Sequence, residues 1–131
     1  MKKIIIVSIC CVLALVAGII LWMRLPDPRL KHVSREIFSA KIEGNADYLW
    51  DAACNELQEL FIKEHGSKEA FLEMVKEGQA IYSNLVEWEI GNLIDFGERA
   101  TVPVVLKYKD GSEDIFYLYL IKIDGIWKVH R

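Results

Sequence analysis

Three carboxylates in this chain of 131 residues have a spacing that could support chemistry. Glu87 and Glu89 are two residues apart in a stretch that alternates apolar and polar residues, which predicts a strand with both side chains on one face, about 7 Å apart. Asp95 is expected on the same face. Such a group could transfer protons or hold a hard cation such as calcium. The alternation favours a simpler interpretation, a solvated face of a sheet opposite Trp88 and Ile90.

The histidines and cysteines show no pattern that is typical of a catalytic or metal site. No two of the three histidines, His32, His65 and His130, have the spacing of metal ligands. Cys54 lies among apolar residues at helical spacing, where cysteine acts as a small buried hydrophobic side chain. Glycine-rich phosphate loops and the motifs of serine hydrolases are absent. The sequence therefore predicts no metal site and no cofactor, and it favours a role without catalysis.

A run of 20 residues without a charge begins at Ile4 and ends at Met23. As a helix it would be about 30 Å long, which matches the hydrocarbon core of a bilayer. We therefore expect residues 1–24 to be a retained transmembrane anchor, which makes the membrane a partner of the chain. A cleaved signal peptide and a lipoprotein are alternatives. They fit less well, because no small-residue cleavage site follows a shorter apolar core.

The side of the membrane on which the remaining chain lies is encoded less clearly. Basic residues flank both ends of the apolar run, and those that follow it favour a cytoplasmic domain. A basic tip followed at once by an apolar run is, however, typical of an export signal, so we expect an extracytoplasmic domain. From Arg24 to Arg131 the chain has 14 basic and 19 acidic residues, a formal charge of −5. This acidic balance argues against nucleic acid as a partner.

Prolines, glycines and capping residues divide the rest of the chain into elements. Pro26 and Pro28 predict an extended stalk over residues 25–33. Capping Ser and Asn residues then begin three helices, and glycines end them, over residues 34–42, 45–64 and 67–77. A period of two predicts four antiparallel strands, over residues 85–96, 101–109, 113–124 and 126–130. Pro103 cannot donate to a ladder, so it should lie at an edge or a bulge.

The third of these strands is apolar on both of its faces. Its even-numbered residues from 116 to 120 are Phe and Leu, and its odd-numbered residues from 115 to 123 are Ile and Tyr. One face can pack on the helices, so the other needs a different cover, either a curled sheet that encloses a pocket or a second subunit. A tight turn at Asp124 and Gly125 places the fourth strand beside the third. Trp127 could then cover part of the second face.

The order of three helices and a meander that ends in Asp-Gly-Ile-Trp-Lys-Val, at residues 124–129, resembles the nuclear transport factor 2-like superfamily. The resemblance implies an α+β, cystatin-like fold over residues 34–131, in which a curved antiparallel sheet wraps around the helices as a cone. Small bacterial envelope proteins of unknown function share this ending. The acid–base enzymes of the superfamily place Asp, His or Tyr in the cone, which draws attention to Asp51, Tyr117 and Tyr119.

We therefore expect a single-pass, membrane-anchored protein of the cell envelope with a nuclear transport factor 2-like domain. Its leading role would be to bind a partner protein or a second copy of itself through Tyr117, Tyr119 and Trp127. An alternative is an apolar cone pocket that binds a small molecule or performs acid–base catalysis, with Asp51 and the tyrosines. A third is a structural inner-membrane subunit of a secretion or conjugation apparatus. A deep cavity lined by Tyr together with an inward Asp or Glu would favour the second role, and a cavity filled by Trp127 or Phe side chains would exclude it.

Overall fold

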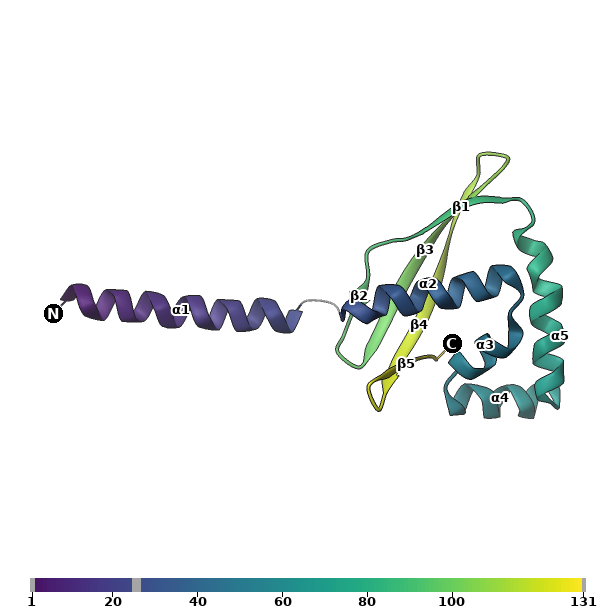
Figure 1. The fold of residues 1–131 in the computed structure, drawn as a ribbon, viewed down its shortest axis with the longest axis horizontal. Helices are drawn as coiled ribbons and strands as arrows, with labels where there is room; N and C mark the ends of the chain where they lie inside the picture. The colour runs from purple at the N-terminus through teal and green to yellow at the C-terminus, as the bar shows by residue number, and fades with distance from the viewer. Residues whose placement is uncertain (1, 25–26, 131) are drawn as a thin grey trace.

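The computed structural model describes residues 2–24 and 27–130, and within them helices cover one face of a curled antiparallel sheet (Figure 1). The elements, in chain order, are α1 (Lys2–Arg24), α2 (Pro28–Glu43), α3 (Ala46–Ala52), α4 (Asn55–His65), α5 (Lys68–Gly78), the 3₁₀ helix η1 (Gln79–Tyr82), β1 (Leu85–Ile90), β2 (Ile94–Asp95), β3 (Arg99–Tyr108), β4 (Glu113–Ile123) and β5 (Ile126–Val129). The strands follow the order β1-β3-β4-β5, and the short β2 also pairs with β3. The predicted α+β class is confirmed.

Helix α1 is apolar and stands apart from the sheet and the other helices (Figure 1). Its segment Lys2–Ile20 is long and apolar enough to cross a membrane, and none of that segment is buried. A signal sequence near an N-terminus has the same length and composition. The helix is therefore a signal or an anchor.

The core lies between α2 and the inner face of the sheet. Helix α2 crosses this face (Figure 1), and its apolar side contributes Leu30, Ile37 and Phe38, all buried. The ring of Phe38 is 4.9 Å from that of Trp88 and 6.0 Å from that of Phe116, measured between centroids. Burial of one such side chain contributes about 1.5–3 kcal/mol. This packing fixes α2 on the sheet and so positions everything that α2 carries.

The first helix of the domain begins at Pro28, and the prediction of an extended stalk over residues 28–33 is wrong. Asp27 caps the helix by accepting a hydrogen bond from the backbone N–H of Arg29 at 3.0 Å. Proline suits the first turn of a helix, where its missing N–H is not needed. Ser34, predicted as the cap, is buried inside α2, where its Oγ donates to the carbonyl of Leu30 at 2.7 Å. Residues 25 and 26 of the stalk lie outside the described residues.

The predicted second helix is two helices, because the chain is extended at Ala53 and Cys54. Ala53 forms a parallel bridge with Val129, the last residue of β5. The N–H of Cys54 donates to the carbonyl of Val129 at 2.9 Å. A contact with the far end of the chain thus replaces a turn of helix, which no local spacing could indicate.

The predicted first strand is also divided, into β1 and β2, and both pair with β3. Pro103 lies where the division occurs: the N–H of Gly91 donates to its carbonyl at 2.8 Å. The missing N–H of this proline would point to the same side, where residues 91–93 leave the ladder. The sequence predicts Pro103 at an edge or a bulge; Pro103 lies in the inner strand β3, opposite the gap between β1 and β2.

Strands β4 and β5 meet at the predicted turn, where Asp124 and Gly125 have φ angles of 51° and 77°. A two-residue hairpin turn of this type requires a positive φ angle at both of its central residues, and its twist matches the twist of the two strands. The register pairs Lys122 with Trp127, so Trp127 lies on the inner face and is only 4% exposed. The prediction that Trp127 covers the outer face is therefore wrong. A shift of one residue decides the face on which every side chain of a strand lies.

Candidate functional site

A partly enclosed, apolar cavity of about 380 Å³ lies between the inner face of the sheet and the helices. Its walls come from α2, α3, α4, α5 and η1 on one side and from β4 and β5 on the other. Apart from Lys41 and the hydroxyl group of Tyr82, its described lining side chains are apolar. Cavities of roughly 300–1,000 Å³ are typical of small-molecule sites. The concave side of the sheet therefore offers space for a ligand.

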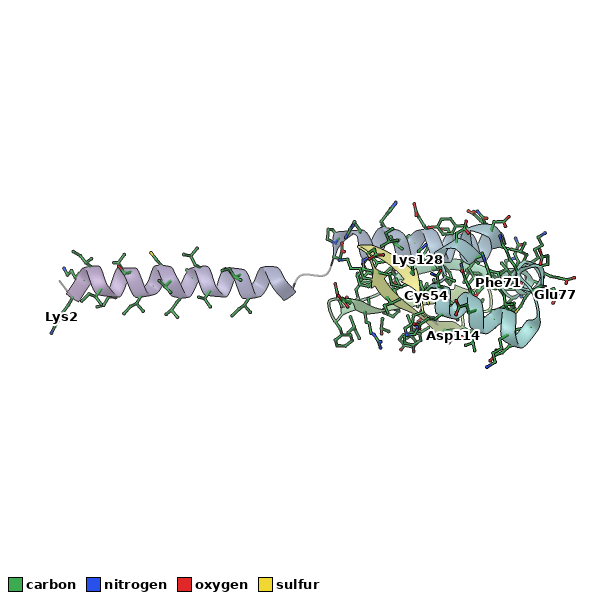
Figure 2. All side chains as sticks on the ribbon, turned by 90° about the horizontal axis from the view of Figure 1, so that it is seen from below. Lys2, Cys54, Phe71, Glu77, Asp114 and Lys128 are labelled. Carbon is green, nitrogen blue, oxygen red and sulfur yellow. The ribbon has the colours of Figure 1, made fainter. Side chains whose placement is uncertain are left out.

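The break between α3 and α4 helps to form this cavity. It turns α4 away from α3, so that α4 and α5 stand at the end of the domain opposite the start of α2, as Figure 1 shows. Three aromatic rings join these helices: Phe71 of α5 lies 5.2 Å from both Trp50 of α3 and Phe61 of α4, between centroids. Figure 2 places Phe71 at this end of the domain, together with Glu77. The outer wall is thus held by its own aromatic cluster.

Lys41 brings a positive charge to the cavity. It lies on α2, one turn after Ile37, and its Nζ is 3.7 Å from the centroid of the Phe116 ring. Burial lowers the pKa of Lys41 to about 8. Among the described residues, no carboxylate forms an ion pair with it. The site therefore presents a half-buried cation, supported by an aromatic face, to an otherwise apolar space.

Tyr82 supplies the second polar group of the lining. Burial raises the pKa of its hydroxyl group, and Tyr108 nearby raises it further. The hydroxyl group therefore stays neutral at physiological pH and remains a hydrogen-bond donor. Lys41 and Tyr82 are therefore the two polar side chains that the described lining offers to a ligand.

The predicted site residues lie away from this cavity. Asp51 is exposed on α3, and its backbone carbonyl accepts a hydrogen bond from Lys128 Nζ at 2.5 Å. It borders a separate polar hollow with Cys54 and Lys128, both labelled in Figure 2. Tyr117 and Tyr119 point to the outer face of the sheet and are 47% and 38% exposed. The structure does not bring Asp51 and the two tyrosines together.

The outer face of the sheet has no cover within the described chain. We call its exposed apolar residues on β4 and β5 the outer patch: Ile115, Tyr117, Tyr119, Ile123 and Ile126. Soluble proteins rarely leave a contiguous apolar surface of this kind without a function. The patch is therefore a candidate contact surface.

The predicted carboxylate group does not assemble. Glu87 and Glu89 are exposed on β1 and pair in register with Lys107 and Val105 of β3. Asp95 lies beyond the break in the strand, opposite Ala100. Within residues 2–24 and 27–130, no three His, Cys, Asp or Glu residues are grouped to hold a metal ion.

Sequence reasoning missed Asp27, which joins the start of α2 to the sheet. Its Oδ2 accepts hydrogen bonds from Lys122 Nζ at 2.9 Å and from Trp127 Nε1 at 3.2 Å, and Arg29 pairs with it at 3.0 Å. Its backbone N–H donates to Asp95 Oδ2 at 3.0 Å. The Arg29 guanidinium holds the pKa of Asp27 well below its usual value, and Lys122 and Trp127 act in the same direction against the opposing effect of burial. We call this group the Asp27 junction.

Comparison with known proteins places these features in a family. The model of a domain of unknown function, DUF4878, matches residues 28–130. The fold is similar to that of a Campylobacter jejuni protein described as a candidate NTF2-like transpeptidase, with a TM-score of 0.58 and 13% identity, over 76% of this chain and 95% of that one. A Rhodopseudomonas palustris protein with a SEC-C motif matches with a TM-score of 0.46 and 17% identity, over 72% and 69% of the two chains. No curated protein matches the chain.

Proposed function

The chain belongs to the family of DUF4878 domains, and we propose that it is a membrane-anchored protein that binds a small, largely apolar molecule in its cavity. The cavity carries this proposal, because it is a partly enclosed apolar space between the helices and the inner face of the sheet. A ligand that removed this lining from water would gain about 25 cal/mol for each Å² of apolar surface buried. The similar fold of the Campylobacter jejuni protein supports the architecture alone.

The test follows binding at Met74, which lines the cavity and is the only methionine after Met23. The full-length protein, with ¹³C-labelled methionine methyl groups and held in phosphatidylcholine nanodiscs, is titrated with decanol as a neutral apolar probe. We expect the Met74 methyl resonance to shift in a saturable manner. A wild-type protein whose Met74 resonance does not move would overturn the proposal.

A matched pair of variants locates the binding. Gly78 also lines the cavity, and a Cβ built there meets no atom within 4 Å, so Gly78→Leu is the variant chosen to occupy space in the cavity. Ala80→Leu adds a similar side chain at an exposed position of η1 that does not line the cavity. Decanol should shift Met74 in Ala80→Leu and leave it unmoved in Gly78→Leu. Equal binding by both variants would place the site elsewhere.

The anchor and its orientation form part of the same proposal. The apolar helix α1 supports insertion, and the basic residues Lys2 and Lys3 at its start support export of the domain. Protease added to intact spheroplasts should then digest the domain while cytoplasmic markers survive. Digestion only after the membrane is permeabilised would assign the domain to the cytoplasm. A chain that starts after residue 24, found by mass spectrometry, would show a cleaved signal.

The outer patch favours a second role, self-association. The charged residues on the same face include Glu87 and Glu89 on β1, Lys107 on β3 and Lys128 on β5. A second copy, packed face to face about a twofold axis parallel to the strands, would set Glu87 and Glu89 of each copy over the β5 edge of the other, where Lys128 lies. Such a dimer would also cover Tyr117 and Tyr119.

Sedimentation of the full-length chain in detergent tests this role. The wild-type chain should form dimers, and Tyr117→Lys should lower the dimer fraction because it adds charge to the centre of the outer patch. Ile62→Lys, at an exposed isoleucine of α4, is the matched control and should leave the dimer intact. A wild-type chain that stays monomeric at all concentrations contradicts self-association.

A further inference from the structure

We infer that the molecule held in the cavity is an anion with an apolar tail, and that the ammonium group of Lys41 holds its head group. The inference rests on the proposed binding function and adds the chemical class of the ligand. It comes from the pairing of one cation with an apolar lining, which the sequence analysis did not anticipate.

The first support is the incomplete compensation of the Lys41 charge. A half-buried ammonium group loses water, and the cation–π contact with Phe116 at 3.7 Å compensates this loss only in part. The pKa of Lys41, lowered to about 8 by burial, reports this cost. At neutral pH the ammonium group of Lys41 is nevertheless still charged. No carboxylate among residues 27–130 forms an ion pair with it. An anion placed beside it would complete the pair.

The second support is what the rest of the lining excludes. No Asp or Glu side chain lies among the described lining residues, so a cationic or zwitterionic ligand would find no partner for its positive charge. A sugar or another polyhydroxyl compound would leave most of its polar groups unpaired against Ile, Leu, Val, Met and Phe side chains. An apolar tail matches these walls, and the Tyr82 hydroxyl group can donate a second hydrogen bond to an anionic head.

The third support is the position of Lys41 within the cavity. It lies on α2, and Phe116 and Leu118 line the cavity from the facing strand β4. The ring of Phe116 beneath the ammonium group keeps the charge at the wall and leaves the space beyond it to apolar side chains of α4 and α5. Lys41 would thus contact the charged head group of the ligand, and the apolar side chains would contact its tail.

Four ligands that share a ten-carbon chain test the inference: decanoate, decyl phosphate, decylammonium and decanol. Each is titrated into the full-length protein in phosphatidylcholine nanodiscs at pH 7, with the Met74 methyl resonance as the readout. We expect decanoate or decyl phosphate to bind at least tenfold more tightly than decanol, and decylammonium to bind more weakly than decanol. The ratio between the two anions assigns the head group to a carboxylate or to a phosphate.

Variants at Lys41 separate charge from packing. Lys41→Met should reduce the affinity for the preferred anion about tenfold or more and leave decanol unchanged, whereas Lys41→Arg should keep the preference for anions. Lys76→Met, at an exposed lysine of α5 that does not line the cavity, is the control and should change neither affinity. In the wild-type protein, anion affinity should also fall when the pH is raised well above 8, because Lys41 then loses its proton. Burial raises the pKa of Tyr82, the other titratable lining group, above its ordinary value of about 10, so this hydroxyl group keeps its proton up to about pH 9.

The outcomes distinguish this inference from the function on which it rests. If decanol and the two anions bind the wild-type protein equally, the assignment to Lys41 and an anion is overturned while binding in the cavity stands. If none of the four ligands moves Met74, the binding function itself is overturned. If Lys41→Met does not fold, the comparison of anion with decanol in the wild-type protein across pH decides between these results.

Discussion

Among single residues, Asp27 shows how an unremarkable position in the sequence becomes a structural centre. Its carboxylate is only 12% exposed, and it accepts hydrogen bonds from a guanidinium group, an ammonium group and an indole N–H. Hydrogen bonds to charged groups contribute about 1.5–3 kcal/mol each when buried, and less where a partner such as Arg29 is largely exposed. The side chain thus joins α2, β4 and β5.

We expect Asp27→Asn to lower the free energy of unfolding by about 1–2 kcal/mol, because the amide keeps the shape of the side chain but loses its charge. Urea denaturation followed by circular dichroism measures this change. Asp47→Asn is the matched control. Asp47 is 79% exposed, and the distance of 3.9 Å between its Oδ1 and Lys68 Nζ is long for an ion pair. Equal effects of the two variants would show that the Asp27 junction contributes no more than a surface pair.

The same residue predicts a dependence on pH. The pKa of Asp27 is lower in the folded chain than the value of about 3.9 in the unfolded chain, so the folded state favours the ionised form. Its contribution to stability is therefore complete above about pH 4 and decreases as the pH falls below that value. The stability difference between wild type and Asp27→Asn should shrink over this range. A difference that stays constant from pH 7 to pH 2 contradicts the assignment.

The candidate site residues show which kinds of residue a sequence can identify. Tyr117 and Tyr119 stood out because their strand is apolar on both faces, and the structure places them on the uncovered face. Lys41 did not stand out, although it follows Ile37 by one helical turn and so lies on the apolar side of α2. A charge on an apolar stripe is the signal that would have found it. Asp51 carried no comparable signal and is exposed.

Among the elements, those defined by local chemistry were predictable. Asn45 and Ser67 cap α3 and α5 as expected, and β4 matches its predicted strand closely. The errors lie where a distant contact decides: Ala53 and Cys54 leave the helix to meet Val129, and β1 ends where β3 presents Pro103. The cavity depends on the first of these breaks. Its existence could therefore be proposed from the sequence, but its walls could not be assigned.

Two helix ends predict opposite responses to the same substitution. Gly78 ends α5 with a φ angle of −65° and has open space where a Cβ would lie, so Gly78→Ala should stabilise the fold by about 0.5–1 kcal/mol. Gly66 ends α4 with a φ angle of 94°, where an L side chain is strained, so Gly66→Ala should destabilise it by about 1 kcal/mol. Thermal unfolding of both variants measures the two signs. A loss of stability in Gly78→Ala would contradict the geometry of α5.

In the whole molecule, the short connection between α1 and Asp27 limits the distance between the domain and α1. Only residues 25 and 26 separate the end of α1 from Asp27, and the three Cα-to-Cα steps between Arg24 and Asp27 span at most about 11 Å. If α1 is held in a bilayer, the start of α2 must lie at the lipid headgroups. Asp95, bonded to the N–H of Asp27, brings the neighbouring Phe96 to this end of the domain.

We therefore expect Phe96, which is 74% exposed, to contact the headgroup region. A nitrobenzoxadiazole label at Phe96→Cys, in a chain with Cys10 and Cys11 changed to Ser, should show blue-shifted emission in nanodiscs. The same label at Asp110→Cys, in the exposed turn between β3 and β4, is the comparison and should emit as in water. Identical emission from both positions would mean that the domain stands clear of the bilayer.

The short connection also bears on how the proposed ligand would reach the cavity. Lys41 follows Asp27 by four turns of α2, which sets it about 20 Å further along the helix axis. Helices α4 and α5 close the domain at that end (Figure 1). If α1 spans a bilayer and α2 stands along the bilayer normal, Lys41 lies about 20 Å beyond the headgroups. A tailed anion bound as proposed would then have to cross the water layer, or be handed over by another protein, to reach Lys41.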